Sequence, residues 1–527
     1  MDLNLRTSSL SKLLVGISYK GETENLPDLL IRQVTGDSRK VVPGALFVAC
    51  PGEAVDGGHD FIENAVAKGA LAVVGEKKAF GIKVPYFQVE NSRLALAFLS
   101  AAFFDHPARK MTMIGITGTD GKTTTANLLF QILKTAGYKT GLISTVNAVI
   151  GDFVLDTGFH VTTPDAPDVQ QYLASMYESG ITHVVLETTS HGWAQFRVDA
   201  CEFDIGIITN ITHEHLDYHG SFEKYRDAKA RLFFSLTETP KKKKGNIRLA
   251  ILNLDDPSYE FLKEVSKCKV ISYSTKEKAD IYADKINLTK NGLQFDANIL
   301  KREHVLINSN LVGEFNISNC LAALSASVIG LGIDPDMAAK GISMMTGVPG
   351  RMERIESGQR FIAVIDFAHT PNALKVALQT ARKMTGGKII AIFGSAGLRD
   401  REKRRLMAET SLSLADLSIF TAEDPRTESL DQILYEMKNG AIAMNGVLGK
   451  NYWLIPDRGE AMRKGIGMAE DGDLVICCGK GHEQSMCFGT TEYAWDDRIA
   501  LKAALAELLG IDGPEMPYLP TQDSSGG

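Results

Sequence analysis

A glycine- and threonine-rich loop with a single lysine follows an apolar run near residue 115. The loop reads GITGTDGKTTT and precedes the apolar-periodic stretch NLLFQILKTAGY. Gly118 and Gly121 would let backbone N–H groups converge on an anion, and the N-terminus of the following helix would add its positive dipole end. Lys122 could neutralise phosphate charge, and the hydroxyl of Thr123 could bind magnesium. The strict P-loop pattern needs another glycine at position 116, so an ordinary turn remains the alternative to a phosphate site.

Further polar side chains follow two other apolar runs of the same region. Glu187 ends the run HVVLE, and Asn210, His213 and His215 come after the run DIGII. The carboxyl ends of parallel strands meet at one edge of a sheet, so these side chains are expected beside the glycine-rich loop. Oxygen and imidazole ligands there would suit magnesium held against ATP, with Thr123 completing the set. Taken singly, Glu187 could be a helix cap and His215 an ordinary loop histidine.

Three blocks of apolar strands and amphipathic helices must position these residues. The first block, 1–108, contains the strand-like ALFVAC and LAVVGE; the central block, 109–345, contains MTMIGIT, HVVLETT and DIGIITNI; the third, 346–527, contains FIAVIDFA, KIIAIFG, LSIFTA and DLVICCG. This alternation predicts an α/β fold with mostly parallel sheets covered on both faces. Around Asn291 the pattern predicts a hairpin, and the tail from about 515 to 527 is expected to be disordered.

Composition limits the classes of partner. The 527 residues carry a formal net charge of −7, so no global basic field attracts nucleic acid or an anionic membrane. The KKKK run at 241–244 is interpreted as a solvated loop. The seven cysteines lack metal-like spacing, and no apolar run approaches the ~18 residues of a membrane span. We therefore expect a soluble cytoplasmic protein, with no nucleic acid or membrane as partner, and a monomer.

Many motifs, in order along nearly the whole chain, resemble the Mur ligase family. They run from DSRKVVPGALFVACPG near the N-terminus, through GTDGKTTT, LETTSHGWAQFRV, TNITHEHLDYHG, YRDAKARLF, LVGEFNISN, VPGRMERI, DFAHTPNAL and GSAGLRDREKRRLM, to GKGHEQ and WDDR. The resemblance implies a uridine-binding N-terminal domain, a central P-loop-type ATPase domain and a Rossmann-like C-terminal domain. It is strongest to the branch that adds the third amino acid of the peptidoglycan stem peptide.

The resemblance implies an ATP-dependent amide ligase. ATP would phosphorylate the D-glutamate carboxylate of UDP-N-acetylmuramoyl-L-alanyl-D-glutamate, and the amine of a diamino acid would attack the acyl phosphate. A carboxylate is a poor electrophile because its negative charge repels a nucleophile, and phosphorylation turns one oxygen into a leaving group. The reacting partners are anionic, so the site must supply cations such as Lys122 and magnesium.

Site residues carry over by motif position. The implied ATP-binding residues are Gly118, Thr119, Asp120, Gly121, Lys122, Thr123, Thr124, Asn316, Arg351 and His369. The implied residues for the UDP-linked substrate are Ser38, Glu53, Ala54, Val55, Thr162, Thr163, Thr189, Gln195 and Arg197. The implied catalytic residues are Lys122, Glu187, His215 and Lys229, and the metal set is Thr123, Glu187, His215 and Lys229. A helix-capping role for Asn316 is compatible with ATP binding.

Lys229 has two interpretations. Its motif position matches the lysine that the family carboxylates with CO2, which would replace an ammonium by an anion that binds magnesium. Arg226 and Arg231 lie on the same predicted helix, and without the resemblance a solvated basic face is the better interpretation.

The choice of amino acid depends on EDPR, which comprises Glu423, Asp424, Pro425 and Arg426. Family members that use meso-diaminopimelate show DNPR there, and the arginine binds the distal carboxylate. Arg426 favours that carboxylate, with Arg399, Gly479 and Glu483 at the matching contacts. Glu423 and Asp424 depart from the pattern and add negative charge that would favour an ammonium. We favour meso-diaminopimelate over lysine or ornithine. Two alternatives remain open: another Mur-type ligase such as folylpolyglutamate synthetase, and a P-loop ATPase switch.

Overall fold

The computed structural model describes residues 6–21, 29–52, 57–78, 81–151, 153–155, 163–212, 216–289, 292–300 and 303–522. The chain divides into two compact units. The first comprises Met1–Tyr282, Ile299–Glu303 and Asn319–Gly341, and the second comprises Ala283–Asn298, His304–Ser318 and Ile342–Gly527. The predicted domain boundaries near residues 108 and 345 stay predictions. Six predicted site residues lie outside the described residues: Glu53, Ala54, Val55, Thr162, His213 and His215.

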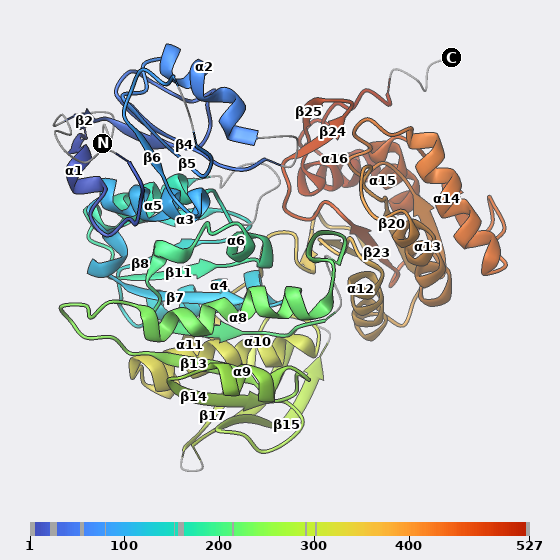
Figure 1. Cartoon of the computed structure of the whole chain (residues 1–527). Coiled ribbons are helices and arrows are strands. Elements are labelled where there is room, and N and C mark those ends of the chain that lie inside the picture. Colours follow the sequence, from blue (N-terminus) through green and yellow to red (C-terminus); the bar gives the residue numbers. More distant parts are fainter. Residues whose placement is uncertain are drawn as a thin grey trace. The chain divides into compact units, whose positions relative to one another are not determined.

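The N-terminal part of the first unit is built on a parallel sheet of order β3-β4-β5-β6 (Figure 1). Its strands are β3 (Gln33–Thr35), β4 (Ala45–Ala49), β5 (Ala72–Gly75) and β6 (Tyr86–Gln88). Alternate residues of β4 enter two cores: Leu46 and Val48 share one with α3 (Ser92–Phe103), and Phe47 shares the other with α2 (Ile62–Ala67). Beside them lie β1 (Ser8–Ser9), α1 (Leu10–Leu13), β2 (Leu30–Ile31), η2 (Gly57–Phe61) and η3 (Pro107–Lys110).

The large sheet of the first unit has the order β10-β9-β8-β11-β7-β12-β13-β14. The strands from β8 to β14 in this order are parallel, and β9 and β10 continue the edge as antiparallel strands. Their bounds are β7 (Thr112–Thr117), β8 (Thr140–Ile143), β9 (Ala148–Ile150), β10 (Phe153–Leu155), β11 (His183–Glu187), β12 (Ile205–Ile208), β13 (Leu249–Asn253) and β14 (Lys269–Ser274). The predicted mostly parallel α/β sheet is confirmed.

Helices cover this sheet because the crossovers between parallel strands need them. They are α4 (Lys122–Thr135), α5 (Ala166–Glu178), α6 (Ser190–Ala194), η4 (Asp199–Cys201), α7 (Leu216–His219), α8 (Phe222–Glu238), α9 (Tyr259–Val265), α10 (Phe315–Leu324), η5 (Ser325–Gly330) and α11 (Pro335–Ser343). The apolar face of α8 enters the sheet core through Leu232, Phe233 and Leu236. This packing holds the middle of α8, where Lys229 is buried, in place.

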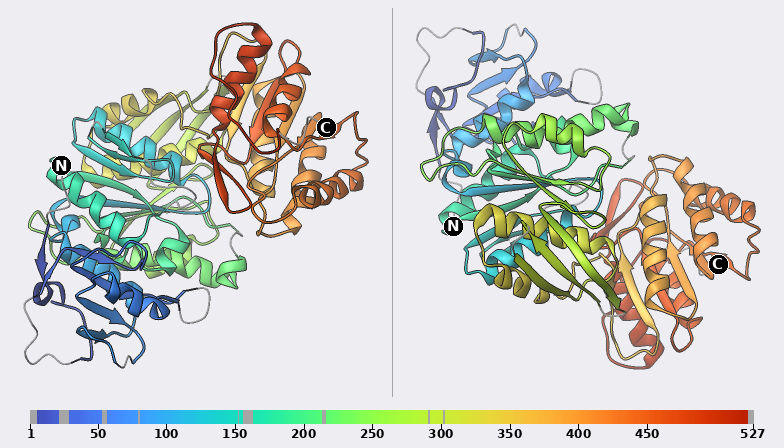
Figure 2. Two further views of the ribbon diagram at one scale, coloured as in Figure 1. Left: turned by 90° about the horizontal axis from the view of Figure 1, so that it is seen from above. Right: turned by 90° about the horizontal axis from the view of Figure 1, so that it is seen from below.

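The second unit contains a sheet of order β18-β19-β23-β20-β21-β22, parallel from β19 onward. Figure 2 shows this part of the chain, coloured orange to red, as strands with helices beside them. One face packs on α12 (Pro371–Met384), α13 (Glu402–Leu414) and α14 (Leu430–Ala443), and the other packs on α15 (Arg458–Gly467) and α16 (Asp497–Leu509). The strands are β18 (Glu353–Arg354), β19 (Ile362–Asp366), β20 (Ile389–Phe393), β21 (Leu417–Phe420), β22 (Tyr452–Leu454) and β23 (Leu474–Cys478).

Two smaller β features complete the chain. A hairpin joins β24 (Ser485–Phe488) to β25 (Thr491–Ala494). The strands β15 (Ile281–Thr289), β16 (Gly292–Ile299) and β17 (Glu303–Ser309) continue the order of the large sheet after β14, and β15 pairs with β14 in parallel. The predicted strands on both sides of residue 291 are therefore present. The predicted disordered tail is wrong for residues 515–522, because Leu519 is fully buried in the second unit's core and Thr521 donates to Asp457 at 2.7 Å.

Candidate active site

The glycine-rich loop joins the end of β7 to the start of α4 and is held by the residues after β12. The N–H of Thr119 donates to the backbone oxygen of Asn210 at 2.8 Å, and the N–H of Asp120 donates to its side-chain oxygen at 2.9 Å. The hydroxyl of Thr209 donates to the oxygen of Asp120 at 2.6 Å. A Cβ at Gly118 would lie 1.8 Å from that hydroxyl oxygen, so only glycine fits here. The predicted strand, loop and helix arrangement is confirmed.

A second glycine places the N-terminus of α4 behind this loop. Gly121 has φ +80° and precedes the 14-residue helix, and an added Cβ would lie 2.3 Å from Asn319 Oδ1. Lys122 begins the helix, and its amine donates to the oxygen of Thr119 at 2.7 Å, across the loop. The end of the helix and the lysine both favour an anion at the loop, as a phosphate site requires.

Thr123 and Glu187 meet at the end of β11. The hydroxyl of Thr123 donates to the two carboxylate oxygens of Glu187 at 3.1 and 3.0 Å, and the N–H of Thr145 donates to one of them at 3.0 Å. Both side chains are buried. Hydroxyl and carboxylate oxygens are the ligands that magnesium prefers. The described residues contain no cluster of three or more acidic, histidine or cysteine ligands, and the predicted ligand His215 lies outside them.

Lys229 is buried, not part of a solvated basic face. It is 2% exposed, and its amine donates to the oxygen of Gly118 at 2.5 Å and lies 4.5 Å from the centre of the Tyr225 ring. Its neighbours on α8 are also engaged: Arg226 stacks on an aromatic ring, and Arg231 binds the carboxylate of Asp199. The structure therefore brings Lys229 to the glycine-rich loop and rules out the solvated-face interpretation.

A cavity of about 1170 Å³ in the first unit contains three of the predicted substrate residues, Ser38, Gln195 and Arg197. Arg197 donates to the oxygen of Thr163 at 2.6 Å, and two of its nitrogens donate to the side-chain oxygen of Gln195 at 3.0 and 2.6 Å. Four further cations line the same cavity: Arg32, Arg39, Lys40 and Arg93. Four aspartates line it as well, Asp37, Asp60, Asp165 and Asp168, of which Asp37 pairs with Arg39 and Asp165 with Arg197. The cavity is large enough for a nucleotide-sized ligand, and its slight excess of cations favours an anionic one.

Thr163 and Thr189 connect this cavity to the Glu187 strand. The hydroxyls of the two threonines are 3.1 Å apart, and the N–H of Thr189 donates to the hydroxyl of Thr163 at 3.1 Å. Thr189 also caps α6 by accepting from the N–H of Gly192. Sequence reasoning missed Tyr218, whose hydroxyl oxygen accepts from the amide nitrogen of Gln195 at 3.1 Å. Its place in HLDYHG, just after the predicted metal ligands, is the signal that could have found it.

In the second unit, Arg351 and His369 pack on one ring. The guanidinium of Arg351 lies 4.5 Å from the centre of the Phe367 ring, and His369 Nδ1 donates to the oxygen of Phe367 at 2.9 Å. The amine of Lys403 donates to the oxygen of His369 at 3.2 Å. Burial, assisted by Arg351, lowers the pKa of His482 to about 3, so His482 is neutral at physiological pH. Asn316 is buried, and its amide donates to the oxygen of Val312 at 2.7 Å.

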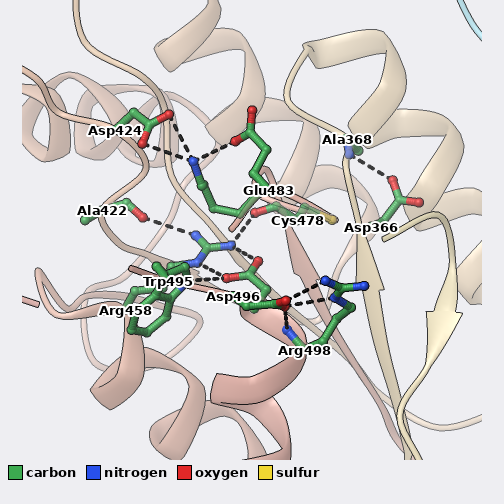
Figure 3. A network of polar contacts seen from close by, with 12 residues as sticks. Asp366, Ala368, Ala422, Asp424, Arg458, Cys478, Glu483, Trp495, Asp496 and Arg498 are labelled. Carbon is green, nitrogen blue, oxygen red and sulfur yellow. Dashed lines mark hydrogen bonds and ion pairs between the residues drawn. The ribbon is translucent and has the colours of Figure 1, made fainter. Parts of the chain in front are cut away.

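The EDPR loop follows β21 and contains two residues in the left-handed region, Asp424 with φ +42° and Arg426 with φ +54°. The amine of Lys480 donates to both oxygens of Asp424 at 3.0 Å and lies 2.6 Å from Glu483 (Figure 3). The N–H of Cys487 donates to Asp424 at 2.9 Å. The negative charge that the sequence places at Asp424 is therefore paired with a buried lysine.

Glu423 and Gly479 touch at the base of this loop. Glu423 is buried, its Oε2 has no hydrogen-bond partner among the described residues, and burial raises its pKa to about 7. A Cβ at Gly479, which has φ +110°, would lie 2.4 Å from that oxygen. Arg426 is half-buried, and within the described residues its guanidinium has no hydrogen bond or ion pair. Arg399 is exposed. Arg426 is thus the available cation of this loop.

Three family models match the chain. They are described as Mur ligase family, catalytic domain, at residues 30–104; Mur ligase middle domain, at residues 116–327; and Mur ligase, glutamate ligase domain, at residues 350–481. Together they account for the glycine-rich loop, the Glu187 strand and the EDPR loop. Their order is the order in which the sequence predicted the three blocks.

Individual relatives match over nearly their whole length. The UDP-N-acetylmuramyl-tripeptide synthetase of Roseiflexus sp. (strain RS-1) is 41% identical and covers 91% of this chain and 95% of its own. The UDP-N-acetylmuramoyl-L-alanyl-D-glutamate–2,6-diaminopimelate ligase of Geobacillus thermodenitrificans is 39% identical over 91% and 96%. A solved structure of a ligase with the latter name superposes with a TM-score of 0.67 at 29% identity, covering 95% of this chain and 99% of that one.

The fold and the phosphate loop define an ATP-dependent ligase with a three-domain α/β architecture. The chain belongs to the Mur ligase family. Dependence on ATP and magnesium follows from this membership, as predicted. Among the described residues, no helix is both long and apolar enough to cross a membrane.

Proposed function

We propose that this ligase adds a diamino acid, with meso-diaminopimelate favoured over L-lysine or ornithine, to UDP-N-acetylmuramoyl-L-alanyl-D-glutamate. The names of the relatives support the substrate class. The cavity beside Gln195 and Arg197, in which cations outnumber aspartates, supports an anionic, nucleotide-linked substrate. The observation that carries the choice of amino acid is the guanidinium of Arg426, which has no hydrogen bond or ion pair among the described residues, while the nearby Asp424 is paired with Lys480.

The phosphate loop would perform the first step. The N-terminus of α4 and the amine of Lys122 hold the phosphates of ATP, and the γ-phosphoryl group passes to an oxygen of the D-glutamate carboxylate. The amine of the diamino acid then attacks the acyl carbon, and phosphate leaves with the bonding electron pair as the amide forms. Lys122 lowers the cost of bringing two anions together, since it can follow the charge from one oxygen to the next.

Thr123 and Glu187 would hold magnesium. Both offer oxygens at the start of α4, 3.0 to 3.1 Å from each other, and Thr145 orients the carboxylate through its N–H. When bound, magnesium supplies positive charge against the phosphate oxygens. The donor set fits a hard divalent cation.

We propose that Lys229 is carboxylated by CO2 during turnover and then supplies an anionic oxygen at the glycine-rich loop. The burial of Lys229 against the oxygen of Gly118 supports this, because it places the lysine nitrogen at the glycine-rich loop and away from solvent. Lys229→Ala should abolish ligation, with partial rescue by formate or acetate, and wild-type activity should fall in CO2-depleted buffer. Lys224→Ala, an exposed lysine on the same helix, serves as the control and should keep full activity. Full activity of Lys229→Ala would reject the role.

The amino-acid assignment is tested by a screen. With ATP and UDP-N-acetylmuramoyl-L-alanyl-D-glutamate fixed, each amino acid is supplied in turn and the product is detected by its mass. Arg426→Ala should lower kcat/KM for diaminopimelate by the equivalent of roughly 2–5 kcal/mol, because it leaves a partly desolvated carboxylate unpaired. Lysine has no such carboxylate and should lose much less. Equal losses for every amino acid would make Arg426 structural.

The same assay separates the alternatives. A folylpolyglutamate synthetase would ligate glutamate to a folate and ignore the UDP-linked dipeptide, and a P-loop switch would hydrolyse ATP without either substrate. ATP hydrolysis that requires the UDP-linked dipeptide and a diamino acid together supports the proposal. The expected cytoplasmic location and monomeric state are part of it, and light scattering of the purified protein tests the latter.

A further inference from the structure

We propose that Lys480 is a positioning residue that sets the amino-acid selectivity of this ligase. It binds the carboxylates of Asp424 and Glu483, which offsets one of their two negative charges beside the amino-acid site, and it holds the EDPR loop so that Arg426 presents a cation there. The inference rests on the proposed function, because it concerns the choice between amino acids that end in a carboxylate and those that end in an ammonium.

The contacts of Lys480 leave its amine fully occupied. The side chain is 0% exposed, and its amine lies 3.0 Å from both oxygens of Asp424 and 2.6 Å from Glu483. Figure 3 shows the carboxylates of Asp424 and Glu483 pointing toward this shared amine. A buried ammonium survives only with such partners, and the ion pairs with Glu483 and Asp424 outweigh burial and raise the pKa of Lys480. Lys480 therefore remains charged at every working pH.

Asp424 links Lys480 to the backbone of the EDPR loop. Its carboxylate accepts from the N–H of Cys487 on β24, and the N–H of Arg426 donates to the oxygen of Cys487 at 3.0 Å. The oxygen of Arg426 accepts from Gly489 at 2.7 Å. Non-glycine residues rarely occupy the left-handed region, so Asp424 and Arg426 stay there because these contacts hold them. Loss of the contact between Lys480 and Asp424 would therefore loosen the segment that orients the guanidinium of Arg426.

The charge of Lys480 and the loop geometry that it maintains both favour an amino acid that ends in a carboxylate. With Lys480 in place, Asp424 is paired and the Asp424–Glu483–Lys480 cluster carries one net negative charge instead of two. Arg426 is the cation of the loop, and its guanidinium has no hydrogen bond or ion pair among the described residues. Without Lys480, Asp424 and Glu483 would lose their ammonium partner in a partly desolvated region beside the same loop, and the pair would carry two negative charges. Unpaired carboxylates attract an ammonium and repel a carboxylate, so selectivity would move toward lysine or ornithine.

The test measures kcat and KM for diaminopimelate and for lysine in a set of full-length variants. Lys480→Met should lower the ratio of kcat/KM for diaminopimelate over lysine by about tenfold or more, mainly through the KM for diaminopimelate. Lys480→Arg, which retains the charge, should keep most of the selectivity. The control is Lys388→Met, since Lys388 pairs with Glu470 on the surface of the same unit, and its ratio should be unchanged.

A second substitution separates positioning from a direct effect of charge. Asp424→Asn alone should change the ratio by less than about threefold, because Asp424 is already bound by Lys480 and does not face the amino acid. In the Lys480→Met background the same change should recover part of the lost selectivity. If Asp424→Asn alone shifts the ratio about tenfold toward diaminopimelate, Asp424 contacts the amino acid directly and the inference is wrong.

The outcomes also separate this inference from the proposed function. If the wild-type enzyme accepts neither amino acid on the UDP-linked dipeptide, the proposed function fails before Lys480 is tested. If the wild type is selective and Lys480→Met folds but retains that selectivity, only the inference fails. If Lys480→Met does not fold, Asp424→Asn alone distinguishes positioning by Lys480 from direct contact of Asp424 with the amino acid. This variant removes the charge of Asp424, and Lys480 keeps Glu483 as its partner.

Discussion

Glu423→Gln should remove a large pH dependence from the stability of the second unit. Glu423 is buried with one carboxyl oxygen lacking a hydrogen bond among the described residues. Burial raises its pKa from 4.5 to about 7, although the nearby Lys403 opposes the shift. Between these two values the folded protein binds this proton more tightly than the unfolded chain, so the free energy of unfolding falls as pH rises from about 4.5 to about 7 and is then level.

The size of the effect follows from the two pKa values. They differ by about 2.5, and each whole pKa value is worth about 1.4 kcal/mol, so ionising Glu423 costs the folded protein about 3 kcal/mol. Glutamine has nearly the same shape and does not titrate. The difference in stability between Glu423→Gln and the wild type should therefore grow in favour of the variant by about 3 kcal/mol between pH 4.5 and pH 7.5.

The measurement must report the second unit alone, because a chain of several domains need not unfold in one step. Hydrogen exchange of peptides from β19, β20 and β23, measured at several urea concentrations and at both pH values, gives the local free energy of opening. Glu356→Gln, an exposed glutamate of the same unit, is the control and should follow the wild type. If Glu423→Gln and wild type show the same pH dependence, Glu423 is ionised throughout and the argument from burial is refuted.

Two further substitutions test the first unit, each against a matched lysine. Lys122→Ala should lower the rate of ligation by about 100-fold or more without changing the circular dichroism spectrum. The control, Lys134→Ala at the exposed end of the same helix, should stay active. Near-normal turnover of Lys122→Ala would reject the phosphate role of Lys122. Lys242→Met should lower the free energy of unfolding, measured in urea, by about 3–5 kcal/mol, because it leaves the buried carboxylate of Asp204 without its lysine. The exposed control Lys243→Met should have the stability of the wild type. Similar urea midpoints for the two variants would show that the ion pair does not contribute to stability.

The fold was predictable where the signal is local. Each predicted strand of the phosphate region is a run of apolar residues, and β7, β11 and β12 follow those runs. Their parallel order was predictable too, since alternating strands and helices leave little choice. The placement of Glu187 beside Thr123 follows from the same rule, because parallel strands end at one edge.

Pairing between distant charges was not predictable. The KKKK run was interpreted as a solvated loop, but Lys242 is 6% exposed and binds Asp204 and the oxygen of Met111. Its neighbours Lys241 and Lys243 are exposed. Nothing in four identical letters says which lysine turns inward, because the partner that decides it, Asp204, lies just before β12, far away in the sequence. Lys229 shows the same limit, since its burial depends on the carbonyl of Gly118.

The EDPR loop shows why this limit matters for specificity. By sequence, two acids beside one arginine give the loop a net negative charge, which favours an ammonium-ended amino acid. In the structure, Asp424 is bound by Lys480 from the GKGHE segment, and burial raises the pKa of Glu423 to about 7. Asp424 is thus paired, Glu423 is only partly ionised at neutral pH, and Arg426 is the cation of the loop. The effect of a charged residue in a specificity motif on selectivity can therefore be judged only when its partner elsewhere in the fold is known. A change at Lys480 could alter selectivity while the EDPR sequence stays the same.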